Sequence, residues 1–283
     1  MSTRVAVIQM VSSASVEANL DAAARLIGAA AADGAELVLL PEVFAVLEGG
    51  PMRQYGEIEG EAGENSIQGF LSTQARQHQL ILVGGTIPLI SRPARLASAD
   101  DLLIQDGRVR ASCLVYDSQG DQIARYDKIH LFDVMVNDQQ SQYSESRSYE
   151  AGDEIVSVDT PAGHLGLSVC YDMRFPELYR ELFRRGAEIV TVPAAFTKVT
   201  GEAHWEVILR ARAIENQCYV IAAGQGGKHS ASRETWGQSM IIDPWGKVLS
   251  QIATGEGMAI AEIDLNYLRE IRERMPIKEH LKL

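Results

Sequence analysis

Residues 166–179 read Gly166-Leu-Ser-Val-Cys170-Tyr-Asp-Met-Arg174-Phe-Pro-Glu-Leu-Tyr179, and they place one cysteine between an apolar run and a helix start. The apolar run predicts a short buried strand over 165–169, and Pro176 is suited to begin a helix that continues to Gly186. A thiol at such a bend is a candidate nucleophile, because the backbone N–H groups after it can receive negative charge. An isolated cysteine is more often a small core residue, so its neighbours must decide between the two interpretations.

Outward from this bend, apolar runs of strand length alternate with amphipathic segments of helix length. Strands are expected over 4–10, 36–40, 80–83, 108–116, 122–127, 155–159, 165–169, 188–192, 218–223, 239–242, 248–252 and 258–263, the last three as an antiparallel set. Helices are expected over 15–34, 66–79, 176–186, 205–215 and 265–274, with a short charged tail at the end. The remaining segments are an acidic, glycine-rich loop over 48–64, a polar connection over 91–107 without an assigned element, and a long polar loop over 133–153.

An internal repeat runs through this order of elements. Residues 34–44 (GAELVLLPEVF) match residues 186–196 (GAEIVTVPAAF) in type at most positions, and 80–85 and 115–120 parallel 219–224 and 241–246. The first strand then corresponds to the strand that precedes Cys170. We therefore expect one domain over residues 1–283, built from two related α/β halves. Their sheets should pack face to face with helices outside, because each sheet must bury one face.

Composition excludes several classes of protein. The 26 basic and 38 acidic residues give a net charge of -12, which opposes binding to nucleic acid or anionic membranes and favours a small-molecule partner. The cysteines at 113, 170 and 218 lack CxxC spacing, which predicts reduced thiols and argues against a disulfide framework or a zinc site. No apolar run approaches the length of a membrane span, and the first residues are too few for a signal peptide, so we expect a cytoplasmic protein.

Three reactive side chains, Glu42, Lys128 and Cys170, directly follow predicted strands. Ligand sites of α/β proteins gather at the carboxyl ends of strands, so these three side chains could converge. Glu42 has Ala194 as its counterpart in the repeat, so the shared architecture does not require a carboxylate at that position. Each charged residue alone would fit a solvated surface position, whereas the coincidence of all three predicts a reactive site.

These residues also carry a resemblance to a known family. Leu40-Pro-Glu42-Val-Phe44, Tyr126-Asp-Lys128-Ile-His-Leu-Phe132 and the segment 166–177 resemble the three catalytic motifs of the nitrilase superfamily of carbon–nitrogen hydrolases. Blocks at 201–206, 210–219, 243–246 and 263–267 are similar to its Nit branch. The resemblance covers nearly the whole chain. It implies a four-layer αββα sandwich, a homodimer with sheets extended across the interface, a small-molecule amide as substrate, and no metal or organic cofactor.

The resemblance implies a role for each motif residue. Cys170 would attack the amide carbon after Glu42 removes its proton, since a free thiol with a pKa of about 8.5 is mostly protonated at neutral pH. Lys128 and the backbone N–H of Tyr171 would stabilise the oxyanion. The products would be a carboxylate and ammonia, formed through a thioester. A second carboxylate is expected in the long loop, and Glu145 fits that pattern as the residue that orients Lys128 or assists the base.

Further residues are expected near the substrate. Arg174 would hold either Glu177 or a substrate carboxylate, and the contact with Glu177 is preferred because an arginine beside a helix start has local partners. Phe196 and Thr197 lie at the strand end opposite Glu42 and are expected to line the pocket.

Other functions fit some of these observations. In a cysteine–histidine hydrolase the base would be an imidazole, and His130, His164 and His204 are available. In a redox protein or a non-enzymatic interaction protein the charges at the strand ends would be incidental. Within the family, ω-amidase activity on α-keto acid amides, N-carbamoyl amino acid hydrolysis and nitrilase activity stay open, and a small α-keto acid ω-amide is the preferred substrate.

Overall fold

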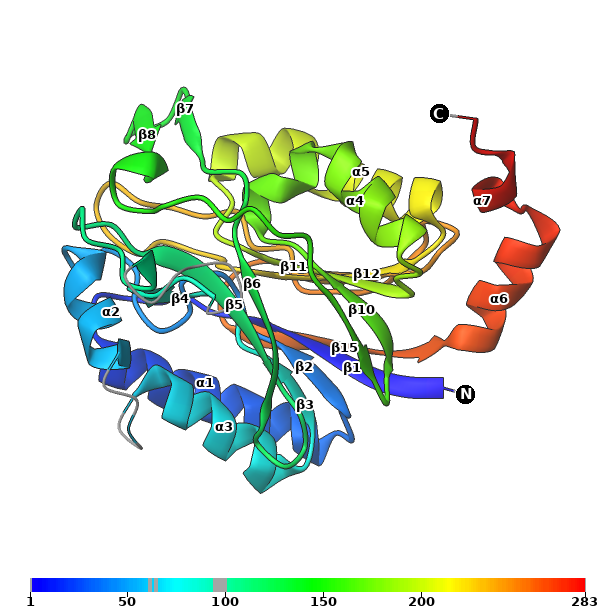
Figure 1. Ribbon diagram of the computed structural model, residues 1–283, viewed down its shortest axis with the longest axis horizontal. Helices are drawn as coiled ribbons and strands as arrows, with labels where there is room; N and C mark the ends of the chain where they lie inside the picture. Colours follow the sequence, from blue (N-terminus) through cyan, green and yellow to red (C-terminus); the bar gives the residue numbers. More distant parts are fainter. Residues whose placement is uncertain (1, 61–62, 64–65, 94–100, 283) are drawn as a thin grey trace.

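Two β-sheets lie face to face in the part of the chain that the computed structural model describes, residues 2–60, 63, 66–93 and 101–282 (Figure 1). The first sheet has the strand order β15-β1-β2-β3-β5-β4, and β6 also pairs with β5. In it β1, β2 and β3 run parallel, and the other pairings are antiparallel. Its strands are β1 (Ser2–Gln9), β2 (Leu37–Leu39), β3 (Ile81–Val83), β4 (Ile87–Leu89), β5 (Arg110–Tyr116), β6 (Gln122–Asp127) and β15 (Gly257–Asp264).

The second sheet has the strand order β14-β13-β12-β11-β10-β9. Here β10, β11 and β12 run parallel, and the flanking strands are antiparallel to them. Its strands are β9 (Ser157–Thr160), β10 (Gly163–Leu167), β11 (Ile189–Ala194), β12 (Tyr219–Gly224), β13 (Met240–Ile242) and β14 (Val248–Gln251).

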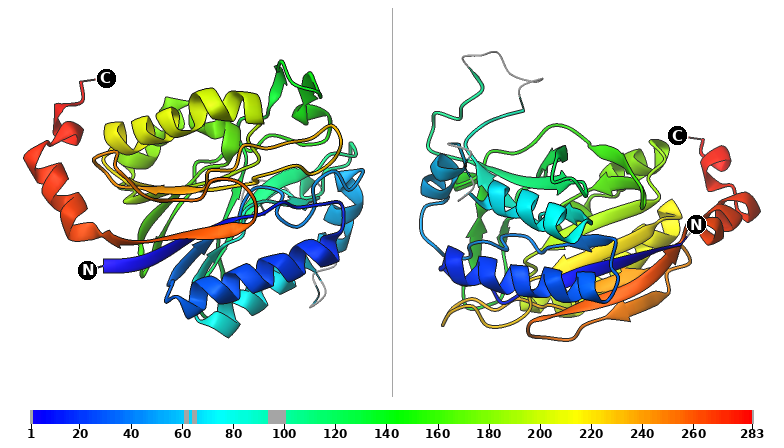
Figure 2. Two further views of the ribbon diagram at one scale, coloured as in Figure 1. Left: turned by 180° about the vertical axis from the view of Figure 1, so that it is seen from behind. Right: turned by 90° about the horizontal axis from the view of Figure 1, so that it is seen from below.

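Helices cover the outer face of each sheet. The α-helices of the described residues are α1 (Val16–Ala32), α2 (Met52–Gly60), α3 (Ile67–His78), α4 (Pro176–Arg184), α5 (Lys198–Asn216), α6 (Leu265–Arg274) and α7 (Ile277–His280), of which α6 and α7 lie beyond the end of β15 at the side of the sheets (Figure 1). Figure 1 shows α1 and α3 below the first sheet and α4 and α5 above the second, and Figure 2 shows the same layers from behind. The predicted αββα sandwich is therefore confirmed. No helix in the described ranges is long and apolar enough to cross a membrane.

The alternation of side chains along a strand divides the core into two clusters. On β1, Val5 and Val7 belong to the cluster between the sheets, which also contains Leu165 of β10. Ala6 and Ile8 point the other way, into a cluster with apolar residues of α1 and α3. Successive strand residues face opposite sides of a sheet, so strands covered on both faces are apolar throughout.

Local sequence explains where α1 begins and ends. The Ser15 hydroxyl accepts a hydrogen bond from the N–H of Ala18, which satisfies one of the free donors at the helix start. After Asp33, Gly34 adopts a φ of +83°, a left-handed conformation that favours glycine, and the chain turns into β2. Both ends agree with the sequence prediction.

The structure differs from the sequence prediction in several segments. The predicted loop 48–64 contains α2, and the predicted charged tail contains α7. Helix α5 begins seven residues before the predicted helix start at Trp205. Strand β15 pairs with β1 of the first sheet, so the expectation of an antiparallel set over 239–263 is wrong for its last strand. Pairing between the two ends of the chain leaves no local signal in the sequence. The predicted connection 91–107 lies partly outside the described residues.

The repeat is visible in the pairing pattern, because β15-β1-β2-β3-β5-β6 corresponds strand by strand to β9-β10-β11-β12-β13-β14. The N–H of Ile81 donates to the carbonyl of Glu36, and the N–H of Tyr219 donates to that of Glu188. The sequence comparison paired Tyr219 with Leu80, so the hydrogen bonds move that alignment by one residue. A run of similar apolar residues permits such a slip, which only the ladder of hydrogen bonds fixes.

Candidate active site

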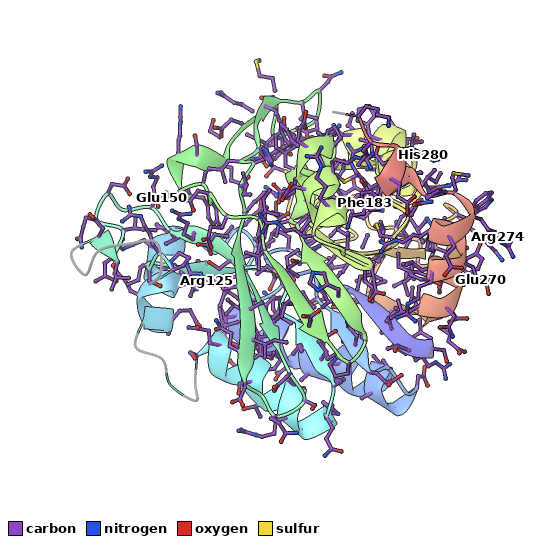
Figure 3. All side chains as sticks on the ribbon, turned by 45° about the vertical axis from the view of Figure 1, so that its right-hand side comes forward. Arg125, Glu150, Phe183, Glu270, Arg274 and His280 are labelled. Carbon is purple, nitrogen blue, oxygen red and sulfur yellow. The ribbon has the colours of Figure 1, made fainter. Side chains whose placement is uncertain are left out.

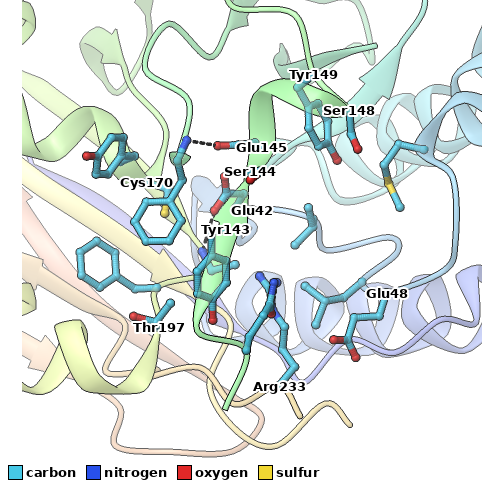
Figure 4. Close-up of a pocket in the computed structure, with 18 of the residues that line it drawn as sticks. Glu42, Glu48, Tyr143, Ser144, Glu145, Ser148, Tyr149, Cys170, Thr197 and Arg233 are labelled. Atoms are coloured by element: carbon cyan, nitrogen blue, oxygen red, sulfur yellow. Dashed lines mark hydrogen bonds between the residues drawn. The ribbon is translucent and has the colours of Figure 1, made fainter. Parts of the chain in front are cut away.

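Three strand ends meet at one cavity of about 290 Å³ (Figure 4). Glu42 comes after β2, Lys128 directly after β6 and Cys170 after β10, and all three line the cavity. The parallel strands β1 and β2 of the first sheet and β10 and β11 of the second all have their carboxyl ends on the side of this cavity. The structure thus brings together the three side chains that the sequence singled out.

Cys170 lies at a sharp bend between β10 and the 3₁₀ turn Cys170–Arg174, which leads into α4. Its φ is +47°, a left-handed conformation that is unfavourable for a residue with a side chain, by about 1–2 kcal/mol. The carboxylate of Asp172 holds this bend by accepting a hydrogen bond of 2.8 Å from the N–H of Val169. The thiol is therefore fixed at the cavity wall by its backbone.

Asp172 is completely buried and accepts hydrogen bonds from other elements. The hydroxyl of Tyr126, on β6, donates to it over 2.7 Å. His130 donates both its backbone N–H, over 3.1 Å, and its ring Nδ1–H, over 2.7 Å, since a carboxylate can only accept. Its ring also stacks on Phe175 at a centroid distance of 3.7 Å. This network joins the bend at Cys170 to the segment that follows Lys128.

The histidines that a cysteine–histidine hydrolase would use lie elsewhere. His130 is committed to Asp172, and His164 forms a 2.6 Å contact with Asp159 on the β9–β10 hairpin. His204 lies beside Arg174, 3.3 Å from its guanidinium. None of the described residues that line the cavity is a histidine. The geometry gives no support to an imidazole base.

Lys128 is held between two carboxylates. Its ammonium donates to Glu42 Oε1 over 2.8 Å and to both oxygens of Glu145 over 2.9 Å. Only 2% of the Lys128 side chain is exposed. Burial alone would lower the pKa of Lys128, but the Glu145 and Glu42 carboxylates raise it well above its ordinary value. The group is a fixed positive charge.

The carboxylate of Glu42 has a second anchor on the other half of the chain. Its Oε2 accepts a 2.8 Å hydrogen bond from the N–H of Ala195, which follows β11. The Glu42 carbonyl accepts from Gln225 Nε2 over 3.2 Å, and the next residue, Val43, has a φ of +50°. The N–H of Val43 donates to Thr86 Oγ1 over 2.9 Å. These contacts fix the direction of the carboxylate.

Glu145 begins a 3₁₀ turn, Glu145–Arg147, directly after the hairpin of β7 (Asp133–Met135) and β8 (Gln142–Ser144). Besides Lys128, its Oε2 accepts a 2.6 Å hydrogen bond from the N–H of Phe132. Burial raises the pKa of Glu145, the Lys128 ammonium opposes this rise, and the Glu42 carboxylate adds to it. The residue expected from the family pattern therefore lies at the site.

An ion-pair network holds the segment after Glu145. Glu150 accepts hydrogen bonds from Arg92 and Arg110, and these guanidinium groups hold the pKa of Glu150 below its usual range. Figure 3 labels Glu150 above Arg125, which pairs with Asp127 at the end of β6. The N–H of Gly152 donates to the Lys128 carbonyl over 2.8 Å. These contacts tie the loop to the strand end that carries Lys128.

The surroundings of Cys170 favour the neutral form of its thiol. Burial raises the pKa of Cys170 well above its ordinary value, and the Glu42 carboxylate raises it further, whereas the Lys128 ammonium lowers it. A neutral thiol is a weak nucleophile, so attack on an amide requires a base beside it. Glu42 lines the same cavity and has the required chemistry.

The residues expected to contact substrate divide into two groups. Phe196 and Thr197 line the cavity, as predicted, and Tyr171 lines it as well. Arg174 does not line it, and its guanidinium carbon lies 5.1 Å from the Phe196 ring centroid and 5.9 Å from that of Tyr171. Among the described residues, Arg174 forms no ion pair with Glu177. It packs behind two cavity walls, a position that the sequence did not suggest.

Other lining residues were not predicted. Glu48, Tyr149 and Arg233 line the cavity, and Figure 4 shows Glu48 and Arg233 away from the group of Glu42, Glu145 and Cys170. Arg233 comes from the irregular segment between β12 and β13, where the sequence has neither periodicity nor a motif. Only its charge in a polar loop could have suggested it.

The fold and this arrangement of thiol, carboxylates and ammonium define a class of enzyme. The chain matches the carbon-nitrogen hydrolase family over residues 4–273 and belongs to that family. It is a hydrolase that acts on carbon–nitrogen bonds other than peptide bonds.

Particular relatives carry a more specific name. The chain is 43% identical to the deaminated glutathione amidase of Yersinia enterocolitica, over 87% of this chain and 82% of the relative. It is 39% identical to that of Homo sapiens, over 98% and 81%. The solved structure of Saccharomyces cerevisiae Nit3, a member of branch 10 of the nitrilase superfamily, has a TM-score of 0.82 and 31% identity, covering 97% of this chain and 94% of that one. The Caenorhabditis elegans NitFhit protein has a TM-score of 0.85 and 38% identity, covering 99% of this chain but 65% of that one.

Proposed function

We propose that this protein hydrolyses a small carboxamide with Cys170 as nucleophile, Glu42 as general base and acid, and Lys128 as the oxyanion donor. The observation that carries the proposal is the convergence of the three groups on one cavity, where burial raises the pKa of the Cys170 thiol. A carboxylate already fixed by Ala195 and Lys128 can accept the thiol proton without reorganising. Glu145 keeps the ammonium in place from its other side.

The first step forms a thioester. Glu42 takes the proton of Cys170 as the sulfur attacks the amide carbon, and the carbonyl oxygen becomes an oxyanion. Lys128 and the backbone N–H of Tyr171 stabilise this charge, and loss of one such donor typically costs about 3 kcal/mol of barrier. Collapse of the intermediate breaks the carbon–nitrogen bond, and protonated Glu42 gives its proton to the departing amine.

The second step releases the acid. Water enters after the amine has left, and Glu42 removes a proton from it as its oxygen attacks the thioester carbon. The carbon–sulfur bond then breaks, and the sulfur recovers a proton from Glu42. The carboxyl group alternates between base and acid, so the cycle needs no other proton carrier near Cys170.

We assign deaminated glutathione as the first candidate substrate, because the relatives at 38–43% identity bear the name deaminated glutathione amidase. In this compound the scissile amide nitrogen belongs to a cysteine residue. Its hydrolysis therefore yields cysteinylglycine together with an α-keto acid, whereas a primary amide yields ammonia. The expectation of ammonia as the product, which the sequence analysis attached to its preferred substrate, is therefore wrong for deaminated glutathione and holds only for primary amides.

The alternative with the nearest chemistry is an ω-amidase that acts on the primary amides of α-keto acids. N-carbamoyl amino acid hydrolysis and nitrile hydrolysis use the same nucleophile. A comparison of kcat/KM for deaminated glutathione, α-ketoglutaramate, an N-carbamoyl amino acid and a simple nitrile distinguishes them. The proposal expects the first to exceed the others by about tenfold or more.

Intact-mass spectrometry tests the chemical role of Cys170. Rapid acid quench during turnover is expected to trap one acyl group per chain, on Cys170, and Cys170→Ser is expected to trap none as a thioester. The other thiols, Cys113 and Cys218, are matched controls because both are free and buried. Turnover without any adduct, together with full activity of Cys170→Ser, would exclude the proposal. Absence of turnover on every amide would favour a redox or interaction protein.

We also propose that two copies of the chain associate through the outer face of α5. Val207 and Ile214 of this helix are 69% and 48% exposed, and Trp245 in the adjacent β13–β14 turn is 61% exposed. Exposed apolar side chains grouped in this way are typical of interfaces. Sedimentation equilibrium is expected to give a dimer for the parent and for Met135→Glu, and a monomer for Val207→Glu. Monomeric behaviour of the parent would contradict the assignment.

Residues 1–283 are proposed to form one domain in the cytoplasm. The cluster between the sheets contains residues of both halves, which supports joint unfolding, and the three cysteines are free, which suits a reducing compartment. Circular dichroism and tryptophan fluorescence are expected to report coincident denaturation transitions. Separate transitions would indicate independent halves.

A further inference from the structure

Arg233 is a cation at the cavity that has no ionic partner among the residues the structure describes. It lies in the segment that joins β12 to β13 and lines the same cavity as Cys170. Its guanidinium has one long hydrogen bond, 3.4 Å to Gln140 Oε1, and in the described part of the chain it forms no ion pair. A guanidinium carries five N–H donors, so most of its donors have no hydrogen-bond acceptor among the described residues.

The other charges around the cavity are already accounted for. Lys128 is bound by two carboxylates, Glu42 and Glu145, and cannot serve a substrate anion equally well. Glu48 lines the cavity but is exposed, and within the described part of the chain it forms no hydrogen bond or ion pair with Arg233. An anionic ligand therefore finds its available cation at Arg233.

The backbone around Arg233 is held in place. The N–H of His229 donates to the Arg233 carbonyl over 2.9 Å, and the Ser230 hydroxyl accepts from the Arg233 N–H over 3.1 Å. The His229 ring donates from Nδ1 to the Ser12 carbonyl over 2.8 Å, so its Nε2 accepts from the Thr235 hydroxyl over 2.7 Å. Burial lowers the pKa of His229, which keeps the ring neutral in this arrangement.

The side chain is positioned as well. The guanidinium carbon lies 5.6 Å from the centroid of the Tyr143 ring, a cation–π contact that restricts its orientation. Tyr143 also lines the cavity, and its hydroxyl donates to Asp138 over 2.8 Å. A planar cation fixed in advance loses little conformational entropy when it binds a carboxylate through two parallel hydrogen bonds.

We propose that Arg233 is a specificity-determining residue that binds a carboxylate of the substrate, so that the enzyme selects amides which carry a negative charge away from the scissile bond. The inference deepens the proposed function and rests on it. Arg233, rather than Arg174 beside the start of α4, is then the arginine that binds a substrate carboxylate. Arg174 lies behind the rings of Tyr171 and Phe196 and does not reach the cavity wall.

Steady-state kinetics of Arg233→Gln tests the inference. With deaminated glutathione, KM is expected to rise roughly ten- to a hundredfold while kcat stays within about threefold, because a charge-assisted contact made in both ground and transition states is lost. Arg233→Lys should recover part of the KM. With the dimethyl ester of the same compound, which has no carboxylate, the variant and the parent should have the same KM.

Two further substrates locate the carboxylate. The glycine methyl ester of deaminated glutathione and α-ketoglutaramate both keep only the carboxylate of the keto acid. If Arg233→Gln raises KM for both, Arg233 binds the acyl end of the substrate. If it raises KM for neither, Arg233 binds the glycine end. Either result supports a carboxylate contact.

Lys198→Gln is the matched control, because it also removes one positive charge nearby, from an exposed pair with Glu234 outside the cavity. It is expected to leave all KM values unchanged. The inference is overturned if Arg233→Gln raises KM equally for the dimethyl ester, or if it lowers kcat alone. Thermal stabilisation by glutarate, compared with the uncharged glutaramide, provides a readout independent of turnover. The parent should be stabilised by glutarate only and Arg233→Gln by neither, so the Arg233 inference can be decided even if the proposed function fails.

Discussion

The two halves of the molecule share a backbone plan down to the geometry of their turns. In the β5–β6 hairpin, Asp117 accepts backbone hydrogen bonds from Gln119 and Asp121, and Gly120 has a φ of +82°. In the β13–β14 hairpin, Asp243 accepts from the corresponding residues, and Gly246 has a φ of +85°. The same aspartate and glycine recur because the turn requires a side-chain acceptor and a left-handed residue.

The halves differ at the ends of corresponding strands. At three pairs of corresponding positions, one side chain is a carboxylate, an ammonium or a thiol, and its counterpart in the other half has no ionisable group. Counted from the shared strands and turns, the pairs are Glu42 and Ala194, Lys128 and Thr254, and Cys170 and Met10. The backbone plan is therefore satisfied without a carboxylate, an ammonium or a thiol. The comparison assigns those groups to chemistry and the repeated residues to architecture.

The largest effect is expected when Glu42 is replaced by the residue of its counterpart, as Glu42→Ala. Loss of the general base should lower kcat/KM roughly 10²- to 10⁴-fold, because the neutral Cys170 thiol then has no proton acceptor. Steady-state kinetics measures the fall, and circular dichroism should show an intact fold. Glu36→Gln, at the other end of β2 and exposed, is the control that should keep full activity. Comparable activity of Glu42→Ala and the parent would contradict the contrast between the halves.

The next effect concerns stability. In Lys128→Met two buried carboxylates lose their cation, and the free energy of unfolding at pH 7 should fall by about 3–5 kcal/mol. Burial already raises the pKa of Glu145, and loss of the ammonium raises it further. A group whose pKa is raised by folding favours the folded state when it is protonated. The deficit should therefore be smallest below the ordinary carboxyl pKa of about 4.5 and grow as pH rises through the raised pKa.

Urea denaturation between pH 4 and pH 8 measures this dependence on Lys128. Lys198→Met, which removes an exposed lysine, should leave the denaturation midpoint unchanged across the range. A constant deficit for Lys128→Met at every pH would mean that the carboxylates are not its source.

The sequence could predict much of this site, for reasons visible in individual residues. Glu42, Lys128 and Cys170 each follow a clear apolar run, and the repeat showed that Glu42 is not required by the architecture. Glu145 lies in a polar loop and was expected only through the family pattern. Arg233 could not be predicted, because its position at the cavity depends on His229, which contacts Ser12 more than 200 residues away.

The fold shows the same limit. Most strands follow local periodicity, and the starts of α1 and α3 follow their serine caps, Ser15 and Ser66. Strand β15 pairs with β1 and so joins the two ends of the chain. The sequence predicts this strand in one antiparallel set with β13 and β14, which belong to the other sheet. Helix α2 could not be predicted from its sequence, MRQYGEIEG, because the segment is polar and contains two glycines. The helix is formed in the structure because it packs against β4. Tertiary contacts there outweigh a weak local propensity.

A smaller effect on stability and on acylation is expected for Asp172→Asn. Ser12 occupies the corresponding position of the other half, two residues after Met10, so Ser12→Ala is the matched variant. The amide keeps the size of Asp172 but replaces an acceptor by a donor, which should cost about 1–3 kcal/mol of stability. The displaced bend should also slow acylation of Cys170 about tenfold or more. Single-turnover kinetics measures acylation, and Ser12→Ala, which loses a hydrogen bond to the Phe44 carbonyl, should leave that rate unchanged. Equal slowing by both variants would remove the distinction between the two bends.

The smallest effect compares two glutamines at corresponding helix ends. Gln79 and Gln217 both end a helix in the left-handed conformation, with φ values of +52° and +44°. Glycine adopts this conformation without strain, so Gln79→Gly should raise the free energy of unfolding by about 0.5–1 kcal/mol, since the Gln79 side chain is exposed. Gln217 is buried and its amide donates to the Met275 carbonyl over 2.7 Å, which ties the end of α6 to α5.

The same substitution at Gln217 should therefore have the opposite sign. Relief of backbone strain is outweighed by the loss of a buried hydrogen bond, about 1 kcal/mol, and by the cavity that the missing side chain leaves. The free energy of unfolding of Gln217→Gly should therefore fall. Chemical denaturation of Gln79→Gly and Gln217→Gly measures both signs in one experiment. Stabilisation by both variants would mean that the hydrogen bond to Met275 contributes nothing to stability. The end of α6 would then be held to the second half by its remaining contacts alone. One of these is the hydrogen bond from Arg272 to the Gln217 backbone carbonyl, which either variant retains.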